Sequence, residues 1–239
     1  MSAFDVGFVL FPGITQLDFT GPFEVLSRLA TPPAPGVESR FKDARTHLVA
    51  KSMDPVAGDR GLAVLPTRTF ADCPPLDLIC VPGGAGVVEA IGDAETVAFV
   101  HEQGGRARYV TSVCTGAFLL GAAGLLRGRR AATHWAYVDL LPLVGARHAP
   151  GRIVRDGDLI TSGGVSAGID FAFAIAAELA GPEVAMAIQL AIEYDPAPPF
   201  AAGSPDRAPA AAVDLMRQRN ATARAGLRRG LERLGQVGT

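Results

Sequence analysis

Cysteine and charge are both scarce in this chain of 239 residues. The three cysteines, Cys73, Cys80 and Cys114, are too few and odd in number for a disulfide framework, and no pair has the C-x-x-C spacing of a structural zinc site. Charged residues make up only 19% of the chain and the formal net charge is −2, so the sequence offers no general basic field for nucleic acid. We therefore expect neither a metal site nor a nucleic-acid partner.

Long, uninterrupted hydrophobic runs are also missing. No apolar segment is long and clean enough to span a membrane, and the beginning of the chain, MSAFDVGFVLFPG, lacks the basic residues and the cleavage site of a signal peptide. We expect a cytoplasmic protein that does not bind membranes. Hydrophobic residues nevertheless make up 49% of the chain, which is enough for a sizeable core.

Apolar strands alternate with helical segments along most of the sequence. The pattern predicts buried strands over 5–11, 46–50, 76–84 and 107–113, helices over 21–29, 94–104, 166–181 and 182–194, and a hairpin over 151–164 with a type I′ turn at Asp156-Gly157. This alternation favours an α/β fold in which a mostly parallel central sheet lies between two layers of helices, a three-layer sandwich.

The composition changes near residue 195. Residues 1–195 carry the alternating pattern, which favours a single domain. Residues 196–239 comprise a Pro- and Ala-rich arm followed by a basic helix. We expect this arm and helix to pack on the same domain or on the partner subunit of a dimer.

Cys114 stands between an apolar strand and a helix, in the stretch TSVCTGAFLL. Ligands of open parallel sheets bind beyond the carboxyl ends of the strands, and the strand–turn–helix sequence is that of a nucleophile elbow. The free amides and partial positive charge at the start of the following helix would favour a thiolate. The polar neighbours Thr115 and Gly116 favour a functional cysteine here, whereas Cys80 is interpreted as a buried apolar residue.

Three further segments carry candidate groups. The glycines of PGGAG, residues 82–86, either direct N–H groups into the space above the sheet, where they would stabilise negative charge, or simply allow a turn with positive φ. Asp18 precedes the helix predicted over 21–29, where it is either an N-cap or a general acid/base. His134, beside Trp135, is either a base for Cys114 or a capping and packing residue, and the spacing does not decide between them.

Together, four segments resemble the ThiJ/PfpI-like superfamily, which has the flavodoxin-like fold of class I glutamine amidotransferases. The segments are FPGITQLDFTGPFEVL, PLDLICVPGGAG, YVTSVCTGAFLLGAAGLLRGRRAATHW and LITSGGVSAGIDFAFAIAAEL, which lie within residues 4–193. Within the superfamily the chain is similar to the isocyanide hydratases, and that similarity extends into the Pro-rich arm. The resemblance implies the superfamily's fold, a ThiJ/PfpI-like catalytic domain over residues 1–195, and a homodimer.

The resemblance also implies a role for each candidate residue. The nucleophilic cysteine corresponds to Cys114, the acid that faces its sulfur to Asp18, and the neighbouring threonine to Thr115. His134 and Trp135 remain additional candidates, since these enzymes do not depend on a Cys–His–Glu triad. Backbone that binds substrate or an oxyanion corresponds to Gly83, Gly84, Gly163, Gly164, Val165 and Ser166, with Val165 at a position where the isocyanide hydratases have isoleucine.

The implied reaction is the hydration of an isocyanide to an N-substituted formamide. Cys114 would attack the terminal carbon to form a thioimidate, and Asp18 would move the protons, with no metal or organic cofactor. The alternatives are a glyoxalase or stress-response enzyme of the same superfamily, the amidase-like domain of an AraC-type transcription regulator, and a peptidase or amidase. Asp18 in place of glutamate argues against the first, the roughly 45 residues after Tyr194 are too few for two helix-turn-helix units, and the third would need His134 as its base.

Overall fold

The computed structural model of the protein describes residues 4–30 and 44–237. Its strands and helices alternate as the sequence predicts. In chain order the elements are β1 (Phe4–Val9), α1 (Gln16–Leu26), β2 (Ala44–Ala50), β3 (Val56–Ala57), β4 (Ala63–Val64), β5 (Arg68–Thr69), β6 (Leu78–Val81), α2 (Val87–Ala90), α3 (Ala94–Arg106), β7 (Tyr109–Val113), α4 (Gly116–Ala122), β8 (Arg130–Ala131), the 3-10 helix η1 (Trp135–Val144), β9 (Arg147–His148), β10 (Ile153–Asp156), β11 (Leu159–Ser162), α5 (Ala167–Ala180), α6 (Pro182–Ala191) and α7 (Ala210–Val237).

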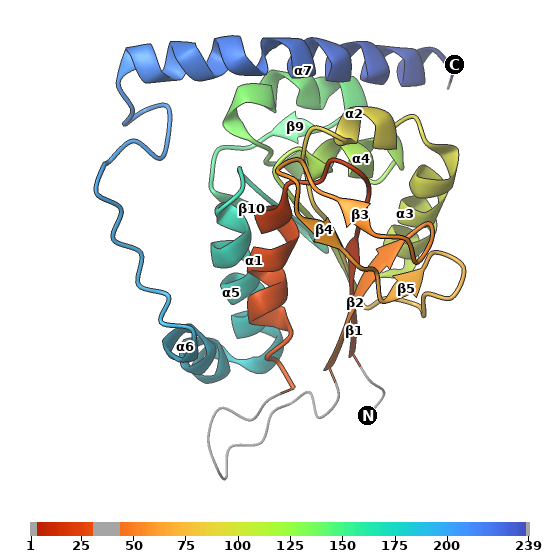
Figure 1. Ribbon diagram of the computed structural model, residues 1–239, viewed down its shortest axis with the longest axis vertical. Helices are drawn as coiled ribbons and strands as arrows, with labels where there is room; N and C mark the ends of the chain where they lie inside the picture. Colours follow the sequence, from red (N-terminus) through yellow and green to blue (C-terminus); the bar gives the residue numbers. More distant parts are fainter. Residues whose placement is uncertain (1–3, 31–43, 238–239) are drawn as a thin grey trace.

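A seven-stranded sheet forms the middle layer (Figure 1). Its order is β10-β11-β7-β6-β1-β2-β5, and every neighbouring pair is parallel except the hairpin β10-β11. The chain adds β2 and β5 on one side of β1, and β6, β7 and β11 on the other. The strand order therefore reverses between β1 and β6, and sheets of this kind bind ligands beyond the carboxyl ends of the strands at such a reversal.

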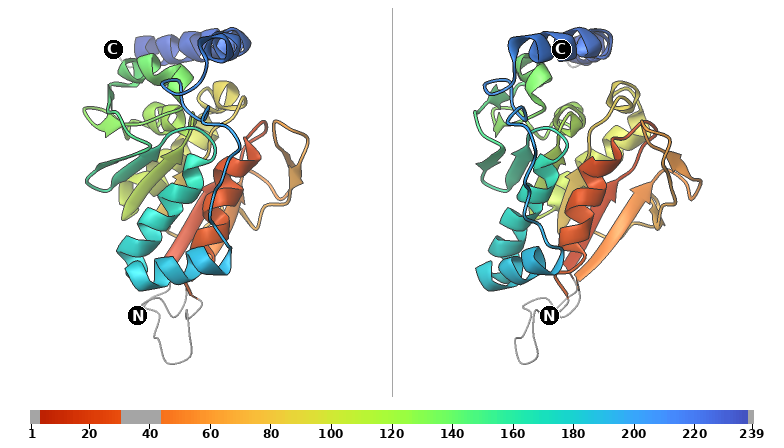
Figure 2. Two further views of the ribbon diagram at one scale, coloured as in Figure 1. Left: turned by 90° about the vertical axis from the view of Figure 1, so that its left-hand side faces the viewer. Right: turned by 60° about the vertical axis from the view of Figure 1, so that its left-hand side comes forward.

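Helices cover both faces of the sheet (Figures 1 and 2). On one face α1 packs along α5, which also contacts α6, and on the other α3 packs against α4. Phe8 of β1, Phe118 of α4 and Phe171 of α5 are among the largest fully buried side chains and represent the three layers. β1 and β6 are buried at every position, which explains why their sequences are mostly apolar. The predicted three-layer α/β class is confirmed.

Helix α1 begins five residues earlier than predicted, at Gln16. Pro22, the second residue of the helix predicted over 21–29, lies well inside α1, where it cannot donate a hydrogen bond to the preceding turn. Close packing on α5 compensates, because a Cβ on Gly168 would lie 3.1 Å from Pro22 Cδ, and one on Gly21 would lie 2.9 Å from the Ile169 side chain. Tertiary contact here overrides local propensity.

The hairpin forms with a different turn from the one predicted. Asp156 pairs with Leu159, so the two-residue loop is Gly157-Asp158. Gly157 has φ of +67°, whereas Asp158 is not among the described residues with positive φ. A positive φ at the first loop position alone fits a type II′ turn, so the prediction of type I′ is wrong.

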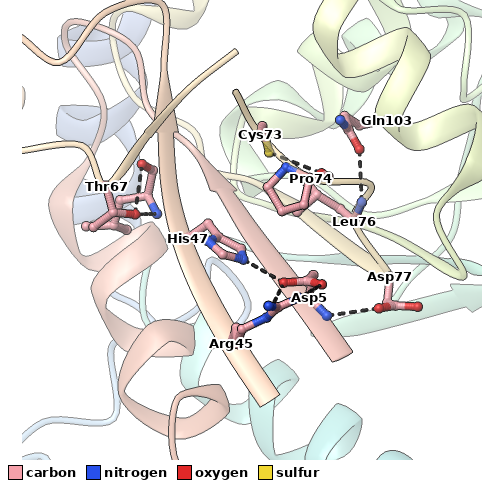
Figure 3. Close-up of polar contacts among 10 residues, drawn as sticks. Asp5, Arg45, His47, Thr67, Cys73, Pro74, Leu76, Asp77 and Gln103 are labelled. Carbon is pink, nitrogen blue, oxygen red and sulfur yellow. Dashed lines mark hydrogen bonds and ion pairs between the residues drawn. The ribbon is translucent and has the colours of Figure 1, made fainter. Parts of the chain in front are cut away.

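A polar cluster joins the amino ends of β1 and β2 (Figure 3). Arg45 donates to both carboxylate oxygens of Asp5, at 3.0 Å and 2.7 Å, and His47 Nε2 lies 2.7 Å from Asp5 Oδ1. The Asp5 N–H in turn donates to Asp77 Oδ2 at 2.9 Å. This cluster lies at the opposite end of β1 from the strand ends that carry the candidate site.

The chain ends its described part in the long helix α7, which crosses above the carboxyl edge of the sheet (Figure 1). An arm without helix or strand leads to it from α6. α7 contacts η1 and α2 of its own chain, and Arg224 and Arg228 both pair with Asp139 of η1. Even α7 is too polar for a bilayer, and none of the helices in the described ranges is both long and apolar enough to cross a membrane.

Candidate active site

Cys114 occupies the sharp turn between β7 and α4. Its φ is +58°, a left-handed value that is uncommon outside glycine. The Cys114 N–H donates to the Gly163 carbonyl at 3.0 Å, and the Cys114 carbonyl accepts from the Thr133 hydroxyl at 2.8 Å. These bonds from two neighbouring segments hold the elbow that the sequence predicted.

The Cys114 thiol is buried against three hydrogen-bonding groups. Burial is the largest effect and, together with the charge of Asp18, raises the pKa of the thiol well above its usual value. Hydrogen bonds from the N–H groups of Val165 and Thr115 and from the Thr115 side chain lower this pKa, but by less. The amides at the helix start favour the thiolate as expected, but burial outweighs them, so the net change in the pKa is upward.

Asp18 lies in the first turn of α1 and is completely buried. Its Oδ2 accepts from the Gly83 N–H at 2.9 Å, and the carboxyl also forms a hydrogen bond with the Cys114 side chain. Burial raises the pKa of Asp18 to about 7, although these two hydrogen bonds lower it. Oδ1 has no hydrogen-bond partner among the described residues. A carboxyl with this pKa can accept or release a proton near neutral pH.

The PGGAG turn after β6 positions side chains instead of presenting free donors. Asp18 takes the Gly83 N–H, and Thr115 Oγ1 accepts from the Gly84 N–H at 3.0 Å. The expectation that these amides would be free to stabilise an oxyanion is therefore not supported. A Cβ on Gly83 would lie 2.6 Å from both the N and Oγ1 of Thr115, so this position has no room for a larger residue.

The loop between β11 and α5 contributes mostly backbone. Gly163 accepts from the Cys114 N–H, and the Val165 N–H reaches the sulfur, with Val165 held at a strained φ of +28°. Gly164 allows close packing, since a Cβ there would lie 2.4 Å from a ring carbon of His134. Ser166 precedes α5 without a side-chain cap, and its hydroxyl lies 3.2 Å from Arg152 Nη2, so the structure does not place this hydroxyl in the site.

His134 begins η1 and acts as its N-cap. Its Nδ1 accepts from the Ala136 N–H at 3.2 Å, and its ring lies 5.6 Å from that of Trp135 and 5.7 Å from that of Tyr137. Burial lowers the pKa of His134. Among the described contacts none joins this imidazole to Cys114 or to a carboxylate, which fits the capping and packing interpretation.

A cavity of about 330 Å³ lies between these residues and α7. Its volume is near the lower end of the range for small-molecule sites, roughly 300–1,000 Å³. Within the described ranges, no three His, Cys, Asp or Glu side chains are grouped so as to hold a metal ion. The lining consists of Thr15, Asp59, Arg60, Gly84, Ala85, Val87, Val88, Cys114, Thr115, His134, Trp135, Tyr137, Val165, Met216, Arg219, Asn220, Ala223 and Leu227.

Sequence reasoning missed several of these residues. Tyr137 lines the same cavity as Cys114. Burial, with a smaller contribution from Cys114, raises the pKa of Tyr137, and its position three residues after His134 was the available signal. Asp59 accepts from the Thr15 hydroxyl at 2.7 Å, and its charge adds to the raised pKa of Asp18. The segment AGDRG around Asp59 has an ordinary turn composition and gave no signal.

Comparison with known proteins identifies the family to which most of the chain belongs. The model of the DJ-1/PfpI family matches residues 5–178. The chain belongs to the DJ-1/PfpI family. The matched segment contains both Asp18 and Cys114, whereas α7 lies beyond it.

Individual relatives of this DJ-1/PfpI protein match more of its length. The isonitrile hydratase of Pseudomonas putida is 54% identical over 219 residues, which cover 92% of this chain and 91% of that protein. A crystal structure of a ThiJ/PfpI family protein from Pseudomonas syringae superposes with a TM-score of 0.87 and 40% identity, covering 98% of this chain and 91% of that one. The HTH-type transcriptional regulator CdhR of Pseudomonas aeruginosa is 28% identical over 190 residues, but the match covers only 53% of the regulator.

Proposed function

We propose that this protein is an isocyanide hydratase, which adds water to an isocyanide and releases an N-substituted formamide. The observation that carries the proposal is the buried pair of Cys114 and Asp18, a thiol in hydrogen-bond contact with a carboxyl of pKa about 7. The 54% identity to an isonitrile hydratase, over 92% of this chain, supports the same activity. Both supports extend beyond fold alone, which many activities share.

In the first proposed step, the Cys114 sulfur bonds to the terminal carbon of the isocyanide. Asp18 takes the thiol proton and passes it to the same carbon, so the product is a neutral thioimidate. Because the pKa of Cys114 is well above that of Asp18, the proton leaves the sulfur as the new bond forms instead of beforehand. The N–H groups of Val165 and Thr115 stabilise the negative charge that develops on sulfur.

In the second proposed step, water adds to the thioimidate carbon. Asp18, ionised again, takes one proton from the water and passes it to the nitrogen. As the carbon–sulfur bond breaks, Asp18 passes the remaining hydroxyl proton to the sulfur, which releases the formamide and restores the thiol. Oδ1 of Asp18 is the oxygen available for this work, because Oδ2 is engaged by Gly83. Apolar side chains such as Val88, Trp135 and Leu227 in the cavity lining suit a poorly hydrated substrate.

The test is incubation of the purified protein with phenyl isocyanide, with N-phenylformamide followed by its absorbance. Wild-type protein and the Cys73→Ser control should form the formamide, whereas Cys114→Ala should not. Methylglyoxal is assayed in parallel. Consumption of methylglyoxal without hydration of the isocyanide would replace the proposal with the glyoxalase alternative.

The proposal includes a homodimer. Met186 and Leu190 lie one turn apart on the same face of α6 and are 60% and 80% exposed, and Phe200 of the arm is 78% exposed. Large apolar side chains in water favour a partner surface that covers them. Light scattering on the purified protein should give twice the chain mass of 24.8 kDa, and a single-chain mass across the assay concentration range would contradict the dimer.

A further inference from the structure

The shape of an isocyanide determines which residues recognise its substituent. The C–N–R unit is linear, so a carbon placed at the Cys114 sulfur directs the substituent away from the sheet. α7 covers the carboxyl edge of the sheet, where Cys114 lies (Figures 1 and 2). The residues that α7 contributes to the cavity are Met216, Arg219, Asn220, Ala223 and Leu227.

Arg219 is the uncompensated charge in this cavity. It is exposed, and it has no hydrogen bond or ion pair with any other described residue. The second lining arginine, Arg60, lies 3.8 Å from Asp59, so these two opposite charges largely cancel. Arg217, two residues from Arg219 on α7, differs from it because it pairs with Asp214 and does not line the cavity.

The charge of the whole helix points the same way. α7 carries six arginines and only two acidic residues. Arg224 and Arg228 share Asp139 of η1, and α7 together with Asp139 still carries an excess of positive charge. A positive field over an apolar cavity attracts a ligand that is apolar at its reactive end and anionic at the other. The charged residues of α7 are Asp214, Arg217, Arg219, Arg224, Arg228, Arg229, Glu232 and Arg233.

We propose that the cavity selects isocyanides that carry a carboxylate at the end remote from the isocyanide carbon, with Arg219 as the residue that binds it. This inference rests on the proposed function. The guanidinium of Arg219 donates two parallel hydrogen bonds to the carboxylate, and Asn220 beside it supplies a neutral donor. The intervening part of the substrate packs against Trp135 and Met216.

The experiment compares 4-isocyanobenzoate with 4-isocyanobenzamide, a neutral compound of nearly the same shape. For the wild-type protein at low salt, we expect kcat/KM to favour the carboxylate by about 3- to 10-fold, the range for a partly exposed charge pair. In Arg219→Gln, the ratio of the two kcat/KM values should fall close to the ratio of the rates at which the two compounds react without enzyme. Arg219→Lys should retain most of the preference for the carboxylate. Arg217→Gln is the matched control and should leave the ratio unchanged, while added salt should lower it in the wild type.

Each outcome separates the inference from the function beneath it. Hydration of both compounds without preference for the carboxylate rejects the inference and leaves the proposed function standing. A preference that survives in folded Arg219→Gln, with circular dichroism like that of the wild type, also rejects Arg219 as its source. Hydration of neither compound by the wild type rejects the proposed function, and the inference with it.

Discussion

Cys114 and Asp18 hold a proton between two buried groups of unequal acidity. Burial raises the pKa of the thiol well above its usual value and raises that of the carboxyl to about 7. Near neutral pH the thiol therefore keeps its proton, while the carboxyl is close to half ionised. This arrangement suits a reaction that must deliver one proton to carbon and later take one from water.

The first prediction separates Asp18 from His134. Asp18→Asn should lower kcat/KM by about 10²- to 10⁴-fold, the range for loss of a general acid/base. His134→Gln should lower it by less than about 10-fold, because the imidazole caps η1 and has no described contact with the reacting pair. Steady-state kinetics with one aryl isocyanide provides the measurement, and the reverse order of effects would favour a Cys–His mechanism.

Stability provides a control for this pair of variants. The pKa of Asp18 is raised on folding from 3.8 to about 7, so its ionisation increasingly opposes the folded state as pH rises from 3.8 to about 7, and this penalty stays constant at higher pH. At pH 8, Asp18→Asn should therefore unfold at a temperature no lower than that of the wild type. Loss of activity in a protein of unchanged thermal stability cannot be attributed to unfolding.

The second prediction concerns the pH dependence of turnover. The reactive form carries one proton on the Cys114–Asp18 pair, so kcat/KM should fall as pH drops below about 7, where the carboxyl becomes protonated as well. Asp59→Asn should move this acidic limb to lower pH, because the Asp59 charge raises the pKa of Asp18. Asp54→Asn, which changes an exposed acid in the turn before β3, should leave the limb in place.

At the scale of elements, the effect of adding a Cβ to a glycine depends on whether neighbouring atoms leave room for it. We predict that Gly83→Ala lowers kcat/KM by at least about 10²-fold, since a displaced Thr115 and Asp18 lose productive geometry. Gly105→Ala, in the last turn of α3 with nothing within 4 Å of the added Cβ, should instead stabilise the protein by at most about 0.5–1 kcal/mol. Chemical denaturation and kinetics on both variants test the contrast, which equal effects would contradict.

The polar cluster at the amino ends of β1 and β2 gives the fourth prediction. Burial raises the pKa of Asp5, but the hydrogen bonds and charges of Arg45 and His47 together lower it by more, so the net change is a decrease. Asp5 therefore stabilises the fold above its unfolded pKa of 3.8, and this stabilisation is lost as pH falls through the lower folded value. Asp5→Asn should lower the free energy of unfolding at pH 7 by about 1–3 kcal/mol, against less than about 0.5 kcal/mol for Arg28→Ala in an exposed helical pair.

At the scale of the whole molecule, sequence predicted what depends on neighbours along the chain. The apolar runs of β1, β6 and β7 and the elbow at Cys114 are local features, and the structure has them where the pattern placed them. The engagement of the Gly83 N–H by Asp18 was beyond reach, because it joins residues 65 positions apart. The predicted start of α1 was five residues too late, because the packing of Pro22 on α5, which allows a proline inside the helix, appears only in three dimensions.

The C-terminal helix shows the same limit over a longer distance. The basic helix was expected to pack on the same domain or on the partner subunit, and no local pattern indicated that Met216, Arg219 and Leu227 would line the cavity. In the structure, α7 packs on the domain with one face and is exposed on the other: Leu227 is buried, whereas Arg229 faces water. The sequence of an amphipathic helix shows which face is apolar, but the surface on which that face packs is known only from the structure.

The position of α7 in the chain also has a consequence for how the protein is made. A ribosome releases the strands and helices that carry Asp18 and Cys114 before it has synthesised α7. The nascent chain therefore contains its nucleophile before it contains the helix that covers the cavity. During that interval α7 does not yet cover the cavity that Cys114 lines. The high pKa that burial imposes on the thiol limits its reactions with oxidants and electrophiles, because a protonated sulfur reacts slowly.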